Sequence, residues 1–364
     1  MRSMVDNKLK ITFTLPGAGY NPVGGFKVVY EYANLLCMRG HQVTVVHTAL
    51  LRTDTPLKEK IRQVLHYYHR RLTGHYRPDN WFNIDHGVSL LWSRSLNDKY
   101  IPDADIVIAT SWETAEWVNR YPEAKGKHFY LVQGLETWSG AEKRVLATWK
   151  MPLKKIVIAK WLKEIADDLG EEATYIQNGL NFNAFGLDVS PEVRNQTRIL
   201  MLHHRLDLKG SADGLAALNI VKRELPDLRA TLFGASAAPS NLPGWIEYHR
   251  RPSQPKLREL YNHAAIFLSP SWSEGWPLPP AEAMMCGAAL VATDIGGHKE
   301  YATHEETALL SPPKDAKSLA ENLLRLIRNP EFRIKLAQQG NAFIQRFTWK
   351  NAVDRFEAAL LQDE

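Results

Sequence analysis

Two carboxylates stand eight positions apart in the segment 271–284, which reads SWSEGWPLPPAEAM. Glu274 belongs to a loop rich in Gly and Pro, and Glu282 falls at the start of an apolar run with helical character. Pro279 and Pro280 suit the first turn of that helix, which is predicted to run to Cys286 with Gly287 as its stop. A loop carboxylate and a helix N-terminus are thereby presented to one ligand, a layout that can hold a sugar and a phosphate together. Paired carboxylates also perform acid/base catalysis in glycosidases, and this alternative stays open.

A basic segment at 203–210, HHRLDLKG, follows a predicted strand. Arg205 and Lys209 leave the strand end together and can both reach a diphosphate. Such cations stabilise the charge on a departing phosphate, which favours a phosphate leaving group over the alcohol of a glycosidase. A solvated basic loop is the alternative. His203 and His204 have no Cys or carboxylate at metal-ligand spacing, so we expect no metal site.

A glycine-rich loop at 16–27 follows the first predicted strand. It does not match the dinucleotide fingerprint, because Pro22 occupies the position of the third glycine. It does not match a Walker A loop either, because Gly24 is followed by Gly25 instead of Lys. What remains is a Gly-Gly pair at a helix start, where free backbone N–H groups and the helix dipole favour an anion. The alternative is a tight turn that needs positive φ.

The elements that must position these loops follow from the apolar pattern. Apolar strands separated by helices imply parallel sheets covered on both faces, and therefore an α/β chain of two doubly wound Rossmann-like domains. Ligands of such sheets bind at the carboxyl ends of the strands, so we expect the two domains to face a central cleft. We predict strands at 10–15, 42–47, 105–110, 128–133, 155–159, 174–176, 198–203, 229–233, 245–248, 265–269 and 289–293. Helices are predicted near 28–36, with Gly40 as its stop, and at 315–328, 331–346 and 349–362.

Composition limits the class of protein. The 364 residues are 45% hydrophobic and 23% charged, as in globular proteins of two ordinary domains. No window of about 18 apolar residues predicts a transmembrane helix, and residues 1–10 lack the apolar region of a secretory signal. Cys37 and Cys286 lie in apolar helical patterns and are predicted to be buried thiols. We therefore expect a cytoplasmic protein.

The net charge of +5 favours anionic partners without selecting among nucleic acid, anionic lipid and sugar nucleotide. Nucleic-acid binding has no motif support beyond charge. Residues 57–77 contain six basic residues and one acid, and apolar residues repeat at helical spacing. Such a segment can lie on an anionic membrane or guide an acceptor that carries a lipid phosphate. The alternative is a surface helix with its apolar side on the core.

Together these motifs resemble the retaining family 4 glycosyltransferases (glycosyl transferases group 1), which have the GT-B fold. The donor-site signature is carried by Glu274-x7-Glu282 and Gly296-Gly297-x-x-Glu300, and the diphosphate pair by Arg205-x3-Lys209-Gly210. Further similar segments are Gly24-Gly25 in the first domain, Gln177-Asn178-Gly179-Leu180-Asn181 before the linker, and Phe347-Thr348-Trp349 at the terminal helix.

The resemblance implies transfer of a sugar from a nucleoside-diphosphate sugar to a hydroxyl acceptor, with retention, in the synthesis of cell-surface polysaccharide, glycolipid or glycoconjugate. The implied acceptor is a sugar, a lipid-linked molecule or a small molecule, and the implied place is the cytoplasm or the inner face of the membrane. The leaving phosphate takes the acceptor proton, so no protein base, metal or other cofactor is expected. Glu282 would hold the donor ribose, Arg205 and Lys209 the diphosphate, and Glu274 the transferred sugar. Further donor contacts are implied for Gly24, Gly25, Gly275, Trp276, Pro277 and Leu278.

The implied organisation is an acceptor-side domain at 1–185, a nucleotide-sugar domain at 186–345 and a terminal helix at 346–364 that crosses back. The polar stretch 183–195 is the predicted linker. A peripheral membrane contact would involve the basic segment 57–77.

Two departures from the family pattern bear on the site. Pro277 has no N–H and cannot donate to phosphate or sugar where the family often has Gly. Gln133 stands at the strand end where many members carry His, and Ser111 and Trp112 are our other acceptor-side candidates. Two alternative functions remain: a sugar-nucleotide 2-epimerase on the same fold, and a non-catalytic sugar-nucleotide-binding subunit.

Overall fold

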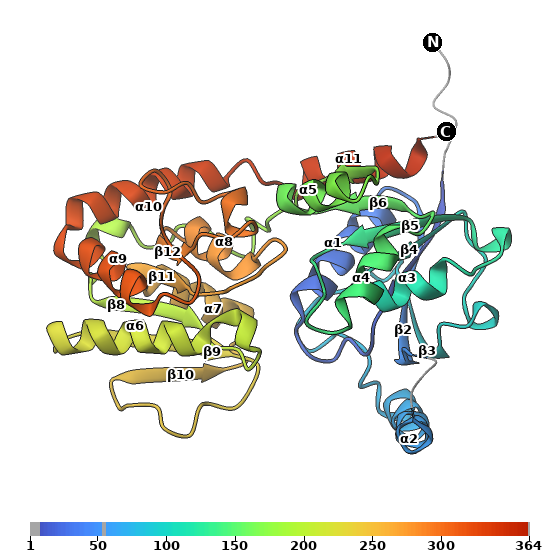
Figure 1. Ribbon diagram of the computed structural model, residues 1–364, viewed down its shortest axis with the longest axis horizontal. Coiled ribbons are helices and arrows are strands. Elements are labelled where there is room, and N and C mark those ends of the chain that lie inside the picture. Colours follow the sequence, from blue (N-terminus) through green and yellow to red (C-terminus); the bar gives the residue numbers. More distant parts are fainter. Residues whose placement is uncertain (1–7, 53–55, 363–364) are drawn as a thin grey trace, which may run out of the picture. The chain divides into compact units, whose positions relative to one another are not determined.

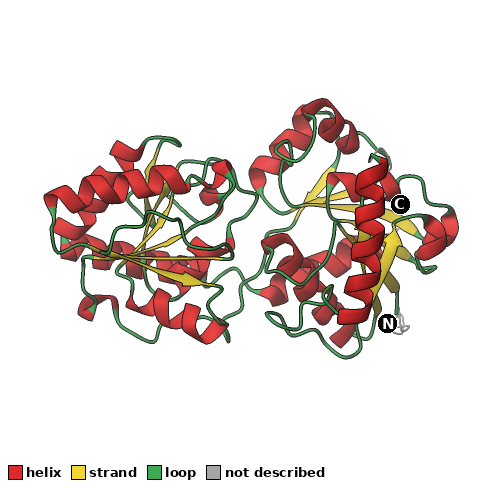
Figure 2. Ribbon diagram, turned by 90° about the horizontal axis from the view of Figure 1, so that it is seen from below, coloured by secondary structure: helices red, strands yellow, loops and turns green. Residues whose placement is uncertain are grey.

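The computed structural model describes residues 8–52 and 56–362, so residues 1–7 of the N-terminal stretch lie outside it. The chain forms two units, one made of Met1–Asn178 with Lys350–Glu364 and the other of Gly179–Trp349 (Figure 1). Each unit has one parallel sheet with helices on both of its faces (Figure 2). The predicted class of two doubly wound Rossmann-like domains is therefore confirmed.

In the described part of the first unit, the sheet has the strand order β3-β2-β1-β4-β5-β6-β7. The order reverses between β1 and β4, so the loops that follow these two strands flank the topological switch point. The strands are β1 (Lys10–Leu15), β2 (Gln42–Leu50), β3 (Ser89–Ser95), β4 (Ile106–Ala109), β5 (Lys127–Val132), β6 (Lys154–Val157) and β7 (Ala173–Tyr175). The helices are α1 (Gly24–Met38), α2 (Leu57–Thr73), α3 (Trp112–Val118), α4 (Glu142–Trp149) and α5 (Lys160–Asp168).

The sheet of the second unit has the order β10-β9-β8-β11-β12-β13, with its switch point between β8 and β11. Its strands are β8 (Arg198–Leu202), β9 (Arg229–Gly234), β10 (Ile246–Arg250), β11 (Ile266–Ser269), β12 (Ala289–Thr293) and β13 (Ala308–Ser311). Its helices are α6 (Ser211–Glu224), α7 (Gln254–His263), α8 (Leu278–Met285), α9 (Ala316–Arg328) and α10 (Pro330–Ile344).

Every predicted strand is present, but the sequence did not predict β3 and β13. Both are edge strands. Ser and Arg interrupt the apolar pattern of β3, and β13 is only four residues long. Gly40 (φ +93°) and Gly287 (φ +81°) end α1 and α8 in the left-handed region, as predicted.

The boundary between the units differs from the expected one. The sequence placed it at 185/186, and the structure places it at Asn178/Gly179. The Leu180 N–H donates to the Phe347 carbonyl oxygen at 2.9 Å. Phe185 packs edge-on against Tyr261 with ring centroids 5.5 Å apart. Residues 179–185 therefore belong with the second sheet, because their contacts lie there.

The two cysteines are free thiols, and their burial differs. Cys286 is buried, as predicted, and burial raises its pKa to about 12. Cys37 is only partly buried, and its Sγ lies 3.7 Å from Oδ1 of Asp85. Across the residues that the structure describes, no helix combines the length and the apolar character that a bilayer crossing requires.

The last helix, α11 (Trp349–Leu361), packs on the first unit through its apolar stripe. Phe356 is fully buried and stacks on Tyr32 with ring centroids 4.1 Å apart. At the rim, Arg39 forms ion pairs with Asp354 and Glu357. The helix is thus part of the core of the first unit.

We expect Phe356→Ala to lower the free energy of unfolding of the first unit by about 3 kcal/mol, because it leaves a cavity beside Tyr32. Chemical denaturation measures this change. The matched control is Ala358→Ser, at an exposed position of the same helix. Equal stability of the two variants would show that α11 does not contribute to the core.

Candidate functional site

The site forms at the switch point of the second sheet, where the loops after β8 and β11 meet. Lys209 Nζ lies 2.6 Å from Glu274 Oε2, with side chains 25% and 13% exposed. The Ser271 hydroxyl donates to Glu274 Oε1 at 2.9 Å. Sequence reasoning named Lys209 and Glu274 separately, and the fold brings them into direct contact. The pair offers a cation and a carboxylate side by side.

The approach of the two loops depends on Gly210, which adopts φ +61°. A Cβ at this position would collide with the carbonyl of Pro270. Trp272 then joins the loops: its N–H donates to the Leu208 carbonyl oxygen at 2.7 Å, and its indole N–H donates to Asp213 at 2.6 Å. Sequence reasoning missed Trp272 as a positioning residue, because its partners lie about 60 residues earlier in the chain.

A buried polar network supports the carboxylate loop from behind. The Thr293 hydroxyl donates to the Ser271 carbonyl oxygen. The His298 Nδ1–H donates to the Thr293 carbonyl oxygen at 2.8 Å, so Nε2 accepts from the Ser269 hydroxyl at 2.8 Å. Burial lowers the pKa of His298 to about 4, which keeps the ring neutral. Gly297 allows its turn to lie against the backbone of Glu274, where a Cβ would clash.

Arg205, in the same loop as Lys209, is exposed and, within the described residues, makes no ion pair. Its cation therefore remains available to an anion. Burial, and then the charge of Arg205, lower the pKa of His203. Burial, and then the charge of Lys209, lower the pKa of His204. Over the described part of the chain, no three His, Cys, Asp or Glu residues converge as metal ligands.

Glu282 is the fifth residue of α8 and lies next to the first turn of that helix. Its carboxylate is nearly buried and accepts a hydrogen bond from the Tyr261 hydroxyl at 3.2 Å. Tyr261 is fully buried, and burial followed by the charge of Glu282 raises its pKa well above the usual value. Tyr261 thus fixes the carboxylate, and the sequence did not identify it.

The loop between the two carboxylates is anchored in the core. Trp276 is buried, with its ring 5.0 Å from Tyr301 and 5.5 Å from Phe347. The Pro277 carbonyl oxygen accepts from the Tyr301 hydroxyl at 2.7 Å. Leu278 is also buried. The Trp276 and Leu278 side chains therefore have a structural role in this loop. The donor contacts expected for Gly275, Trp276, Pro277 and Leu278 stay predictions.

In the first unit, the fold brings the glycine pair and Gln133 together. Helix α1 begins at Gly24, and its N-terminus has neither a side-chain cap nor an acid in the first turn. A Cβ on Gly25 would lie 3.2 Å from the Gln133 amide nitrogen. The Gln133 Oε1 atom is buried and has no hydrogen-bond partner among the described residues. Both strand ends, after β1 and β5, therefore contribute polar groups to one edge.

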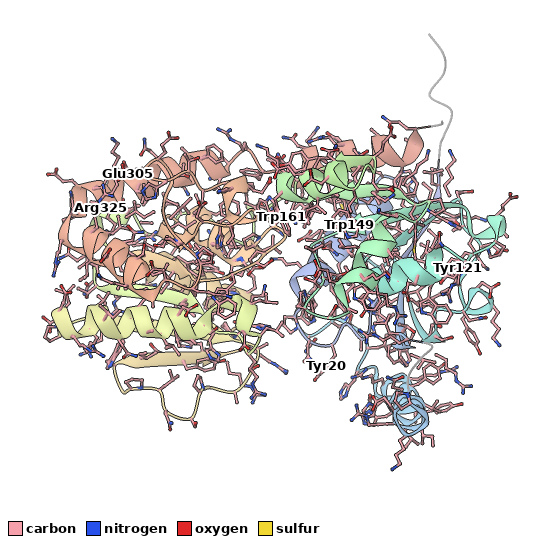
Figure 3. All side chains as sticks on the ribbon, viewed as in Figure 1. Tyr20, Tyr121, Trp149, Trp161, Glu305 and Arg325 are labelled. Carbon is pink, nitrogen blue, oxygen red and sulfur yellow. The ribbon has the colours of Figure 1, made fainter. Side chains whose placement is uncertain are left out.

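The glycine loop is held by a histidine that sequence reasoning missed. His47 is buried within β2, where it pairs with the last residue of β1, Leu15. Its Nδ1–H donates to the Gly17 carbonyl oxygen at 2.8 Å, and Nε2 accepts from Tyr30 at 3.1 Å. Burial lowers its pKa to about 4. Trp81 donates from its indole N–H to the Gly19 carbonyl oxygen at 2.7 Å. Tyr20, labelled in Figure 3, follows directly in this loop and lies 4.5 Å from the ring of His75.

Ser111 and Trp112, the other residues expected on the acceptor side, make contacts within the first unit. Ser111 caps α3, accepting from the Thr114 N–H at 3.3 Å. Trp112 is buried, donates from its indole to Ser139 at 2.9 Å, and lies between Arg52 and Arg144. Both side chains therefore stabilise the connection between β4 and α3. Of the eleven tryptophans, Trp138 alone has an exposed side chain (58%), in the loop that follows β5.

The same loop carries a buried carboxyl group. Glu136 accepts from the Trp112 backbone N–H at 2.7 Å. Its burial raises its pKa to about 8, and the nearby charge of Glu113 adds to the effect. This carboxyl group therefore keeps its proton to a higher pH than an ordinary surface carboxylate does.

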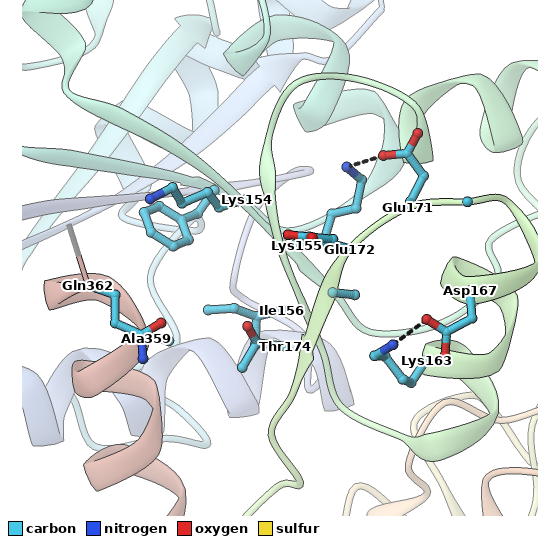
Figure 4. Close-up of a pocket in the computed structure, with 13 residues that line it drawn as sticks. Lys154, Lys155, Ile156, Lys163, Asp167, Glu171, Glu172, Thr174, Ala359 and Gln362 are labelled. Carbon is cyan, nitrogen blue, oxygen red and sulfur yellow. Dashed lines mark hydrogen bonds and ion pairs between the residues drawn. The ribbon is translucent and has the colours of Figure 1, made fainter. Parts of the chain in front are cut away.

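A cavity of about 880 Å³ lies elsewhere in the first unit, between the sheet, α5 and α11 (Figure 4). It is next to the amino ends of β6 and β7, opposite the edge where the loops above gather. Lys155 donates to the carbonyl oxygens of Met151 and Leu153 and pairs with Glu171 at 2.9 Å. Lys163 pairs with Asp167. These polar groups are satisfied internally, so we assign the cavity no role in the site.

Comparison with known proteins points to one family. The family described as Glycosyl transferases group 1 matches residues 188–343, which contain both loops of the second-unit site. The glycosyltransferase MJ1178 of Methanocaldococcus jannaschii, itself uncharacterized, is 31% identical over 108 residues. The match covers 30% of this chain and only 31% of that relative's length.

Solved structures match almost the whole chain. HepE (Alr3699) of Anabaena, in complex with UDP-glucose, gives a TM-score of 0.74 over 97% of this chain and 99% of that chain, at 15% identity. Sucrose-phosphate synthase from Thermosynechococcus elongatus gives 0.71 over 96% of this chain and 98% of that chain, also at 15% identity. At this identity the likeness shows the fold.

The buried carboxyl group of Glu136 predicts a pH-dependent stability. Because its pKa is raised from 4.5 to about 8, folding disfavours the charged form. The contribution to stability is intact at pH values below 4.5 and is lost as the pH rises toward about 8. The unfolding free energy of the wild type, relative to Glu136→Gln, should fall across this window by up to about 1.4 kcal/mol per pH unit. Denaturation at pH 5 to 8 measures the difference.

Glu123→Gln, at an exposed position, is the control and should keep the wild-type dependence of the unfolding free energy on pH. A pH-independent difference would contradict the assignment.

Proposed function

We propose that this protein transfers a sugar from a nucleoside-diphosphate sugar to a hydroxyl acceptor, with retention of configuration, because the chain has the GT-B fold and its residues 188–343 match the family described as Glycosyl transferases group 1. The proposed setting is the synthesis of cell-surface polysaccharide, glycolipid or glycoconjugate in the cytoplasm. We propose UDP-sugars as the first donors to test, because HepE is solved with UDP-glucose.

One observation carries the proposal: the 2.6 Å contact of Lys209 with Glu274 at the switch point of the second sheet. The lysine ammonium has three donors, so it can bridge the carboxylate and a phosphate oxygen at the same time. Arg205 supplies the second cation for the diphosphate. Glu274, held by Ser271, then accepts hydrogen bonds from hydroxyls of the transferred sugar.

The proposed reaction uses these groups for charge and position. The bond between the sugar anomeric carbon and the phosphate oxygen breaks, and a bond to the acceptor oxygen forms on the same face. The acceptor proton passes to the departing phosphate oxygen. Lys209 and Arg205 stabilise the charge that develops on that phosphate. No step requires a dedicated protein base, and we propose that the transfer is independent of metal.

The remaining residues supply binding. We propose that Glu282, fixed by Tyr261, holds the ribose hydroxyls of the donor. On the acceptor side we propose Gln133, whose buried oxygen can accept from a hydroxyl, and the N-terminus of α1 at Gly24 and Gly25. The acceptor is a sugar, a lipid-linked molecule or a small molecule; a lipid-linked acceptor would be met at the inner face of the membrane.

Lys209→Ala and Glu274→Gln should each lower donor turnover at least about 100-fold, because each removes a charge placed at the reacting bond. The measurement is mass-spectrometric detection of hydrolysis or transfer with a panel of UDP-, GDP-, ADP- and dTDP-sugars. Lys317→Ala and Glu321→Gln are matched controls, since this exposed ion pair lies in the same unit, on α9. Both controls should retain wild-type rates.

Three experimental outcomes would contradict the proposed function. Equal rates in all four variants would exclude a role for the Lys209–Glu274 pair. Conversion of the donor to its epimer without an acceptor would indicate the epimerase. Thermal stabilisation by a nucleotide with no turnover of any donor, in the presence of an acceptor panel, would indicate a binding subunit.

Glu282→Gln should weaken nucleotide binding about tenfold, because a charge-assisted hydrogen bond to ribose is replaced by a weaker neutral one. Tyr261→Phe should weaken it less, since the carboxylate keeps its charge and loses only its positioning partner. Titration calorimetry with UDP measures both values. Unchanged affinity in Glu282→Gln would contradict the ribose assignment.

A further inference from the structure

Helix α2 carries an apolar stripe on its outer surface. Ile61, Leu65, Tyr68 and Leu72 are 55%, 64%, 53% and 87% exposed. Their spacing of four, three and four residues places them on one face of the helix. A helix that rests on a core normally buries such a stripe. The expectation that the apolar side lies on the core is therefore wrong here.

The opposite face of α2 makes the contacts with the first sheet. Gln63 and Val64 are half-buried. Tyr67 stacks on Trp92 of β3 with ring centroids 6.0 Å apart, and the Trp92 indole donates to the Tyr67 carbonyl oxygen at 2.9 Å. Helix α2 also contacts β2, and its side chains stand out around it in Figure 3. The helix is thus attached by one face and presents its apolar stripe outward.

This stripe is unlike the other exposed apolar residues. Among the described residues, thirteen large hydrophobic side chains are exposed, and four of them form this stripe. The others are distributed over separate elements, as with Met38 on α1 and Val193 near β8. Single exposed hydrophobics are ordinary on a protein surface, whereas a continuous patch marks an interaction surface.

Charge selects the partner of the stripe. The sequence of α2 contains five basic residues and one acid. Lys58 and Arg71 are exposed and flank the stripe on its two sides at helical spacing. Arg62 is 66% exposed, although it pairs with Glu59 at 2.7 Å. An outward apolar stripe with basic flanks matches the two layers of an anionic bilayer surface, acyl chains below and phosphates above.

We propose that α2 docks the protein on an anionic membrane by laying Ile61, Leu65, Tyr68 and Leu72 into the interface. Lys58, Arg62 and Arg71 then contact lipid phosphates. The proposal identifies a lipid surface as a partner and stands independently of the proposed sugar transfer.

Docking through α2 has a consequence for the glycine loop. The segment after α2 holds that loop: the Gly19 N–H donates to the Tyr76 carbonyl oxygen at 2.8 Å, and Trp81 donates to the Gly19 carbonyl oxygen. Helix α2 also follows the carboxyl end of β2, at the edge of the sheet that carries the loop. The glycine loop is thus hydrogen-bonded to the segment that directly follows the membrane-docking helix.

The test is flotation of the full chain with vesicles of phosphatidylcholine, with or without phosphatidylglycerol. The wild type should float with the anionic vesicles, and added salt should weaken this binding. Leu65→Gln/Leu72→Gln and Lys58→Gln/Arg71→Gln should each reduce the bound fraction about tenfold. Met38→Gln and Val193→Ser remove equally exposed hydrophobics elsewhere and should bind as the wild type does.

Two results would overturn the proposal: no flotation of the wild type, or equal flotation of both double variants and the wild type. A concentration-dependent dimer that Leu65→Gln/Leu72→Gln abolishes would also overturn it, by showing that a second copy covers the stripe. The donor-turnover assay separates this result from the proposed function, because a membrane-deficient variant should still hydrolyse a water-soluble donor. Thermal unfolding of each variant verifies that it is folded.

Discussion

The candidate site of the second unit depends on one contact, between a cation and a carboxylate, at the point where the strand order of its parallel sheet reverses. Lys209 and Glu274 come from loops on opposite sides of the switch point, and both are largely removed from water. An ion pair in such a place loses much of its hydration, so it adds little to stability by itself. Its presence is better explained by binding of a charged ligand, since the desolvated charges are already positioned for it.

This pair is precise because uncharged parts of the structure constrain it. Gly210 lets one loop approach Pro270, and Gly297 lets a third turn approach Glu274. His298 is buried in neutral form, so it acts as a rigid hydrogen-bonding spacer between two strand ends. These residues carry no charge to the site, yet they decide where the charges stand. A substitution that adds a Cβ at either glycine would displace a loop, and the displaced loop would move Lys209 or Glu274 out of the pair.

The carboxyl edge of the first sheet carries polar groups of a different kind. Its carboxyl edge combines an uncapped helix N-terminus with the amide of Gln133, which are weak and adaptable binding groups compared with an ion pair. The neighbouring loop carries the carboxyl group of Glu136, whose pKa is raised to about 8 by desolvation. Helix α2 extends this edge outward with an apolar surface. Next to the membrane-docking surface that we propose, weak and adaptable binding groups suit an acceptor that the membrane presents.

The sequence by itself determined the α/β class, the predicted strands, the helix stops at Gly40 and Gly287, and the two loops that meet at the switch point of the second sheet. These features are encoded by local spacing, which apolar periodicity and glycine conformations report directly. Only the tertiary structure decided which side chains are buried and which face solvent or a ligand. It buried Trp112 and Trp276, turned the stripe of α2 away from the core, and placed Tyr261 and His298 behind the carboxylates. The physical reason is that periodicity identifies an apolar face, whereas burial depends on which distant segment packs against it.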